Sequence, residues 1–550
     1  MKSRILLYLL GLILVLIISI SLSYAYFTAN FEDSETVDTI TVTGGKMKII
    51  YDGGQAIEVE NLIPTDDPVS TKTFTVTGDN STPFDMNYTV NLVIVSNTFS
   101  ESAIKYKLTG ENTNQNGAVI PNTGNLNNIG SGSKTINLGH GIFESPTDGA
   151  KVHTYTLEFY FLNAPYNQDI DKEKEINAYV EVVTYVDPCK EEDCLKNKIL
   201  AQDGGEIAIR EKDIPDFSKV AVSQETYDEL PDVSEEYYPG KNQAVIENGI
   251  YATVDEYGVS YYYRGDKEYL NNNLLFGGYQ WKIVRINGDG SIRLIYNGTE
   301  EDFELNDNEI SEYSYNLIDD KAWNINADDA KYVGYMYGGK DEEYSITREQ
   351  AVTNETDSNI KKIIDLWYSE NIFGQPFENK IVDNLFCNDR QLQSEIGGDS
   401  TGTGYGYVGN HTRYAAYNRL NTNKTPTLKC GLKNDRFTVN DNIISNGDLT
   451  YPVGLLTADE AAMAGLVNDI YNQTNYLTLN GFYFWLETPY MMYISEEYGS
   501  SASMFVIYWS GSLGTYYAFE DIISIRPVIS INAQVKVTGD GSATNPFRVS

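Results

Sequence analysis

The segment that most constrains the fold covers residues 481–530. It predicts two aromatic or apolar strands, over 482–486 and 504–509. After a turn that contains glycine, a nearly continuous apolar run follows over 522–531. A run of this kind is typical of a strand that is buried on both faces. We therefore expect this segment to form the closing half of a folded domain.

Three residues of this segment are expected to be structural. Trp485 is predicted to lie in the core. Arg526 and Pro527 lie inside the apolar run, and a buried guanidinium needs partners for its donors, so Arg526 is expected to tie a strand to a loop. The order of these features resembles the C-terminal half of C-type-lectin-like and formylglycine-generating-enzyme-like domains. The features are a Trp-bearing strand, Thr488-Pro489, an apolar strand, a Gly turn and a last strand with Arg-Pro-Val. The resemblance implies an α+β binding scaffold with long loops.

Four aromatic residues flank the turn at 511–514, where relatives of this fold place ligand-contacting residues. They are the candidate ligand-binding residues Tyr508, Trp509, Tyr516 and Tyr517. Amphipathic rings at such a place stack on sugars or form a protein hot spot. The alternative is core packing, because strand alternation turns about half of such a set inward, and this leaves Trp509 open between the two. No calcium ligand set is visible, and no metal or cofactor is predicted.

The charge of the chain bears on its partners. The 550 residues, enough for two to four domains, contain 40 Lys and Arg against 78 Asp and Glu, a formal net charge of -38. Binding to nucleic acid needs clustered Lys and Arg, which are missing here, so nucleic acid is excluded as a partner. The acidity indicates a solvated, self-repelling surface that suits an extracellular protein.

The first residues predict export. Two positive charges within 1–4 precede 5–21, which are apolar or small and uncharged. Ser23-Tyr24-Ala25 is a small-x-small cleavage site, so residues 1–25 are expected to be a secretory signal, with the mature chain starting at Tyr26. If the site is not used, 5–23 is about long enough to span a bilayer as an N-terminal anchor. The protein is thus expected to be secreted or on the cell surface.

Disulfides are possible in an exported chain. Cys189 with Cys194 would close a small loop, and Cys387 with Cys430 would join two later loops. Zinc is the competing interpretation. Neither spacing has the two-residue form of a zinc knuckle, and only three histidines exist, so a metal site is not predicted.

Residues 26–187 are rich in strand signals and poor in helix signals. Gly- and Asn-rich turns separate several of the strands, which predicts an all-β sandwich with jelly-roll or Greek-key connections. The expected strands are 39–42, 46–51, 73–76, 86–95, 103–108, 153–162 and 176–185.

Short stretches of this half resemble the camelysin/TasA group of exported biofilm-matrix proteins. Its mature start is similar to Ala25-Tyr26-Phe27-Thr28, followed by Ile-Thr-Val at 40–42 and Gly-Lys-Met-Lys-Ile at 45–49. Residues 153–161, 167–169 and 179–182 are similar to its later strands. The resemblance implies a jelly-roll subunit of an envelope or matrix, with self-association through the sandwich as a possible property.

Residues 188–250 are predicted to be an acidic linker with one short helix over 194–201. Residues 251–550 are predicted to form one α+β domain. Its expected strands include 258–264, 280–286 and 291–296, with a hairpin turn at 287–290, its helices cover 357–373 and 457–471, and long loops cover 298–345 and 387–450.

The second half also resembles an uncharacterised set of exported Gram-positive bacterial proteins. The recurring blocks of that set are similar to residues 279–296, 386–390, 449–460 and 525–528. The match covers nearly all of 250–550. It implies no activity.

No catalytic residue is predicted. A Ser or Cys nucleophile needs a base, and His411, the histidine of the second half, lies in a polar loop. The formylglycine-generating enzymes use cysteines near the end of the domain, whereas Cys387 and Cys430 precede the last strand. We expect an adhesion or ligand-recognition protein that binds an extracellular glycan or protein through its C-terminal domain. An envelope enzyme acting on polysaccharide or protein, and a structural matrix subunit without a specific ligand, are the alternatives.

Overall fold

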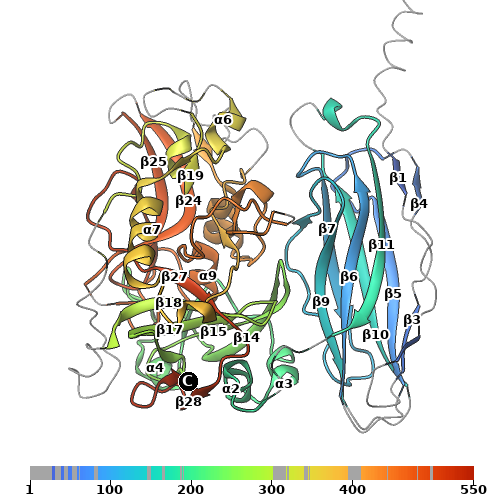
Figure 1. Ribbon diagram of the computed structural model, residues 1–550, viewed down its shortest axis with the longest axis horizontal. Helices are drawn as coiled ribbons and strands as arrows, with labels where there is room; N and C mark the ends of the chain where they lie inside the picture. The colour runs from blue at the N-terminus through green and yellow to red at the C-terminus, as the bar shows by residue number, and fades with distance from the viewer. Residues whose placement is uncertain are drawn as a thin grey trace, which may run out of the picture.

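A computed structural model shows the arrangement of the chain (Figure 1). The structure describes the backbone of 28–30, 39–41, 48–52 and 58–60, and then residues 62–79, 85–144, 150–163, 168–185, 187, 189, 191–300, 318, 321–339, 343, 345, 347–393, 411–442, 444–479, 481–495 and 499–550. The predicted signal over 1–25 lies outside the described residues. Within the described part of the chain, no helix is both long and apolar enough to cross a membrane.

The N-terminal half is a sandwich of two β-sheets, drawn in blue and teal in Figure 1. One sheet has the strand order β4 (Glu58–Glu60), β1 (Thr28–Asn30), β11 (Glu175–Thr184), β6 (Met86–Asn97) and β9 (Lys134–Phe143). The other has the order β2 (Thr39–Thr41), β3 (Lys48–Asp52), β5 (Ser70–Asp79), β10 (Lys151–Phe161), β7 (Ile104–Glu111) and β8 (Asn127–Asn128). Each of the seven predicted strands overlaps a strand of the structure.

The two sheets enclose one core. Alternate residues of β10, such as Tyr155 and Leu157, pack against Tyr88 and Leu92 of the facing sheet, and all four are buried. This period of two is the pattern that indicated strands in the sequence. The sequence pattern missed β9, which contains Gly139 and Gly141. Gly141 is needed there because a Cβ would lie 2.3 Å from the Tyr88 ring.

The segment predicted as an acidic linker is instead folded. It contains α2 (Leu195–Ala201), α3 (Glu206–Arg210), β12 (Val220–Val222), α4 (Gln224–Glu229) and β13 (Ala244–Ile246). Leu195, Ile199 and Ile209 are buried in the same core as the C-terminal strands. The acidic surface residues suggested a solvated linker, but the apolar residues between them supply a buried face that a linker would not have.

The largest sheet of the C-terminal half joins strands from its beginning and its end. Its main order is β14 (Gly249–Asp255), β15 (Gly258–Arg264), β17 (Tyr279–Ile286), β16 (Asn273–Phe276), β29 (Phe547–Val549) and β28 (Val537–Thr538). β18 (Ile292–Thr299) pairs with β17 and with β27 (Val528–Ile531). The predicted hairpin turn joins β17 to β18, and Gly290 N donates to Asn287 O there at 2.8 Å.

The remaining elements surround this sheet. A second, four-stranded sheet has the order β22 (Thr412–Arg413), β24 (Phe484–Ser495), β25 (Gly499–Ile507) and β26 (Leu513–Tyr517). Two short pairs are β19 (Met336–Tyr337) with β20 (Thr356–Asp357), and β21 (Phe386–Cys387) with β23 (Arg436–Phe437). The longer helical segments are α6 (Arg348–Val352), α7 (Asn359–Asn371), a π-helix (Asn418–Asn423) next to α8 (Ala415–Tyr417), and α9 (Ala458–Met463).

Two predicted elements are shorter than expected. The capping box of Thr457 and Glu460 is present, but α9 ends at Met463 instead of near 471. Gly465 follows it with a φ of 110°, a backbone conformation that stops a helix. The apolar run over 522–531 forms a strand only from Val528. This strand joins the large sheet through β18 and does not extend the sheet of β24 and β25, although Val528 and Ile529 are fully buried as predicted.

Trp485 and Arg526 lie where the sequence placed them. Trp485 is 2% exposed and its Nε1 donates to Lys321 O at 2.7 Å. Arg526 is buried next to Pro527, and its guanidinium donates to Tyr296 O, to Leu477 O and to the side chain of Asn297 at 2.7–2.9 Å. It therefore joins the last strands to β18 and to the loop that precedes β24.

Both predicted cysteine pairs are disulfide-bonded. Cys189 pairs with Cys194 directly before α2, and Cys387 pairs with Cys430 across a separation of 43 residues. The second bond fixes the end of β21 to the long loop before β23. That loop faces the sandwich, so the bond stabilises the region where the two halves of the chain meet.

Candidate functional site

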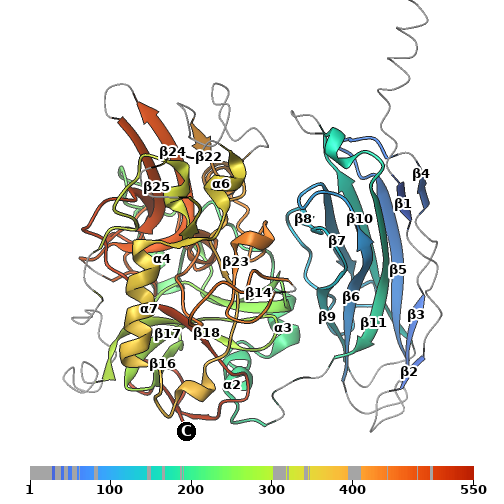
Figure 2. The same ribbon diagram turned by 45° about the horizontal axis from the view of Figure 1, so that its top comes forward.

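The four predicted ligand-binding residues lie on the sheet of β24, β25 and β26. Tyr508 and Trp509 follow β25, and Tyr516 and Tyr517 end β26. Figure 2 shows β24 and β25 side by side at one end of the C-terminal half. Tyr508 and Trp509 therefore lie at the turn between β25 and β26, and Tyr516 and Tyr517 lie at the far end of β26, which is the edge strand of this sheet.

A glycine determines how the first ring lies. Tyr508 crosses β26 at Gly514, where a Cβ would lie 2.2 Å from the ring, and its hydroxyl donates to Thr515 O at 3.1 Å. Tyr508 packs edge-on against Tyr516 at a centroid distance of 5.7 Å, and both rings pack edge-on against Tyr483 at 5.5 Å. The structure thus brings two of the predicted residues together in a half-buried cluster.

Trp509 lies on the surface beside three tyrosines that the sequence analysis missed. Its side chain is 37% exposed and its ring is 5.9 Å from that of Tyr471. Tyr471 in turn stacks on Tyr237 at 5.6 Å and meets Tyr238 edge-on at 5.0 Å. Tyr471 N donates to Tyr237 O at 2.9 Å, so the backbone holds these rings together. Strand alternation left open whether Trp509 lies in the core or on the surface, and the structure places it on the surface.

These tyrosines were missed for a physical reason. Tyr237 and Tyr238 lie in the segment predicted as a linker, and Tyr471 lies where a helix was predicted. Asn472 N donates to Ser510 O at 3.0 Å, which attaches the chain after α9 to the turn that carries Trp509. Sequence spacing carries no signal for such long-range contacts. The adjacent Tyr-Tyr pair between two glutamates and a Pro-Gly turn signal was the available hint.

Tyr517 lies on the other side of the tyrosine cluster. It is 45% exposed and stacks on Phe519 at 5.6 Å. A hollow of about 330 Å³ opens beside it, lined by residues that include Tyr490, Tyr493, Thr515, Tyr516, Tyr517 and Glu520. Burial raises the pKa of Tyr516 to about 12, so its hydroxyl stays protonated and able to donate a hydrogen bond.

The rings lie in three groups, which we together call the aromatic band. It comprises Tyr237, Tyr238, Tyr471, Tyr483, Tyr508, Trp509, Tyr516 and Tyr517. Ring faces, phenol hydroxyls and a carboxylate at one end can bind a ligand that has both apolar and hydroxyl-bearing surfaces.

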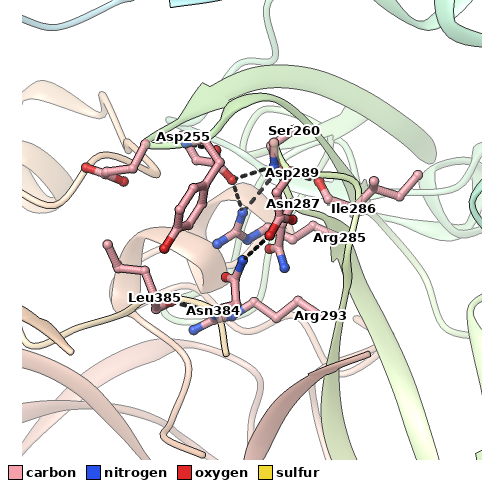
Figure 3. Close-up of polar contacts among 12 residues, drawn as sticks. Asp255, Ser260, Arg285, Ile286, Asn287, Asp289, Arg293, Asn384 and Leu385 are labelled. Carbon is pink, nitrogen blue, oxygen red and sulfur yellow. Dashed lines mark hydrogen bonds and ion pairs between the residues drawn. The ribbon is translucent and has the colours of Figure 1, made fainter. Parts of the chain in front are cut away.

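A buried ionic network lies on the side of the large sheet. Arg285 donates to Asp255 Oδ2 at 2.7 Å and to Glu460 Oε1 at 2.9 Å, and Arg293 pairs with the same Glu460 oxygen at 2.8 Å. Figure 3 shows Arg285 and Asp255 beside Ser260, and Arg293 beside Leu385. None of the four charged side chains is more than 7% exposed, so the network holds strands and α9 together.

The remaining candidate residues of the described chain have the following contacts. Cys387 and Cys430 are bonded to each other, and His411 lies 4.9 Å from the Tyr493 ring. Burial raises the pKa of Glu487 to about 8, but this side chain is fully buried and accepts a hydrogen bond from Leu455 N. Within the described residues, no three His, Cys, Asp or Glu side chains are grouped to hold a metal ion.

Comparisons with known proteins add no further assignment. The chain matches no protein-family model, no curated protein and no solved structure. The function must therefore be inferred from the geometry of the aromatic band and its surroundings.

Proposed function

We propose that this is an exported cell-surface or matrix protein that recognises an extracellular glycan through the aromatic band. The observation that carries the proposal is the grouping of Tyr237, Tyr238, Tyr471 and Trp509, which are exposed except for the half-buried Tyr471 and are held by backbone hydrogen bonds. Sugars present flat C–H faces to such rings and hydroxyls to the groups around them. Preorganised rings lose little conformational freedom on binding.

Within this proposal, the two halves have different roles. The C-terminal half is a C-type-lectin-like scaffold, and its support is the pairing of strands from both ends of that half, as at Leu274 and Phe547. The small sheet of β24 to β26 then presents the binding surface. The sandwich is a jelly-roll-like module that holds this surface away from the cell or joins it to a matrix. The two disulfides of the chain, Cys189–Cys194 and Cys387–Cys430, suit an oxidising location outside the cell.

We expect Trp509→Ala to weaken glycan binding by about 30-fold, or about 2 kcal/mol, because it removes the largest exposed ring system of the band, and Trp is the residue type most enriched at binding hot spots. A glycan array probed with the full chain identifies a ligand, and isothermal titration calorimetry gives the two dissociation constants. Tyr269→Ala is the matched control, since Tyr269 is 44% exposed and lies outside the band.

Two results would count against this function. One is an array with no saturable ligand, which the structural-subunit alternative predicts. The other is a dissociation constant that Trp509→Ala leaves unchanged. Release of a shortened glycan during the titration would favour the envelope-enzyme alternative instead.

A further inference from the structure

A second cavity lies where the sandwich meets the C-terminal half. It has a volume of about 260 Å³ and is lined by residues of β8, β9 and the segment 415–444. Hydrogen bonds join its two walls, from Asn125 Nδ2 to Thr425 O at 2.9 Å and from Asn128 Nδ2 to Gly431 O at 2.7 Å. Figure 2 shows β8 on the side of the sandwich that faces the C-terminal half. We call this cavity the amide-lined cleft.

The charge of this cleft is opposite to that of the whole chain. Acidic residues outnumber basic ones 78 to 40 overall, yet the cleft is lined by four cations, Lys134, Arg419, Lys429 and Arg436, and by one carboxylate, Glu256. Arg419 is neutralised by Asp389 and Asp459 at 2.6 Å. The other three cations still exceed the single acid, so the cleft is a local positive site in an acidic protein.

Lys134 is the cation that the protein leaves least compensated. Its ammonium forms no ion pair with the described residues, whereas Lys429 donates to Asp255 O and Arg436 donates to Cys430 O. Burial lowers the pKa of Lys134, and the charges of Arg436 and Lys433 lower it further, while Glu101 opposes the shift. An anion beside Lys134 would remove this penalty.

The walls also offer hydrogen-bond acceptors that lack donors. Asn128 Oδ1 and Gln393 Oε1 are buried and have no hydrogen-bond partner among the described residues. Both residues line the cleft, together with further side-chain amides such as Asn127, Gln391 and Asn418. Buried acceptors of this kind are satisfied when a ligand or water supplies hydroxyl donors.

We propose that the amide-lined cleft binds an acidic sugar unit, with the anionic group at Lys134 and the hydroxyls at Asn128 and Gln393. The volume is somewhat below the roughly 300–1,000 Å³ of sites for drug-sized ligands, which fits a single small ring and not a chain. The site is separate from the aromatic band. Because residues of both halves form it, a bound sugar also links the sandwich to the C-terminal half.

The test uses the full chain and four probes, D-galacturonate, glucose 1-phosphate, glucose and acetate, with binding followed by isothermal titration calorimetry. We expect saturable binding of at least one of the two acidic sugars and at least tenfold weaker binding of glucose and of acetate. Galacturonate alone would identify the anion as a carboxylate, and glucose 1-phosphate alone would identify it as a phosphate.

Variants locate the binding. Lys134→Gln should weaken binding of the acidic sugar at least tenfold, and Lys134→Arg should keep it within about threefold. Lys362→Gln, which changes an exposed lysine on α7, and Trp509→Ala should leave it unchanged. Failure of the acidic sugars to bind, or binding that survives Lys134→Gln, would overturn the proposal. Because Trp509→Ala tests the aromatic band alone, the failure of one proposal is distinguishable from the failure of the other.

Discussion

Glu460→Gln is expected to lower the free energy of unfolding by about 4 kcal/mol. Glu460 is 3% exposed, pairs with both Arg285 and Arg293, and caps α9 by accepting from Thr457 N. Its carboxylate is held ionised against burial by the two guanidiniums, which lower its pKa. Removing one partner of a buried pair typically costs about 3–5 kcal/mol, because the remaining charge is left uncompensated.

Urea unfolding of the full chain, followed by circular dichroism, measures this loss. Glu229→Gln is the matched control, since it removes an exposed carboxylate from α4 and should change stability by less than about 0.5 kcal/mol. A loss below about 1 kcal/mol for Glu460→Gln would contradict the structural role given to this network.

Acidification is expected to destabilise the sandwich through two buried histidines. Burial lowers the pKa of His140 and of His153 to about 4, each below the ordinary value of about 6.5. His140 stacks on Tyr185 at 4.1 Å and faces Arg210, Lys196 and Glu206. The Nε2 atom of His153 donates a hydrogen bond to Asn116 O at 2.8 Å. Its Nδ1 atom is hydrogen-bonded to the Tyr88 hydroxyl at 2.7 Å.

The sign of the effect follows from proton binding. Each histidine binds its proton more weakly in the folded chain, so the unfolded chain takes up more protons between about pH 6.5 and about pH 4. Stability is therefore full above about pH 6.5 and falls as the pH drops through this window. The loss is about 3 kcal/mol for each histidine.

Urea unfolding at about pH 7.5 and about pH 4 measures this loss of stability. The variant with both His140→Gln and His153→Gln carries no titrating group at these positions, so its loss of stability between the two pH values should be smaller than that of the unchanged chain. Carboxylates other than Glu206, which lies 3.4 Å from His140 Nε2, contribute equally to both chains and cancel in the difference. Equal losses in the two chains would show that these histidines do not couple folding to pH.

Local patterns predicted much of the fold. The alternation in β10, the capping box at Thr457, and the Asn287–Gly290 turn each involve residues close in sequence, and the structure confirms them. The β-rich architecture and both cysteine pairs also agree. The prediction that Arg526 joins a strand to a loop followed from the cost of leaving a buried guanidinium unpaired, which is independent of the surrounding fold.

The features that the sequence did not predict depend on contacts between residues far apart in the chain. Strand β9 was hidden because its glycines, such as Gly141, make room for a ring from another strand. The segment before β14 looked like a linker because its surface is acidic, although Leu195 and Ile199 are fully buried. In the same way, three of the eight residues of the aromatic band are Tyr237, Tyr238 and Tyr471, and their contact with Trp509 depends on tertiary structure.

The most direct test of the aromatic band is a fluorescence titration of the full chain with the glycan found on the array. Of the five tryptophans, Trp509 alone is an exposed one, so stacking of a sugar should change its emission. The account predicts a saturable change in the unchanged chain, and loss of that change in Trp509→Phe, which keeps a ring for binding. The same saturable change in Trp509→Phe, or binding without any change in emission, would contradict it.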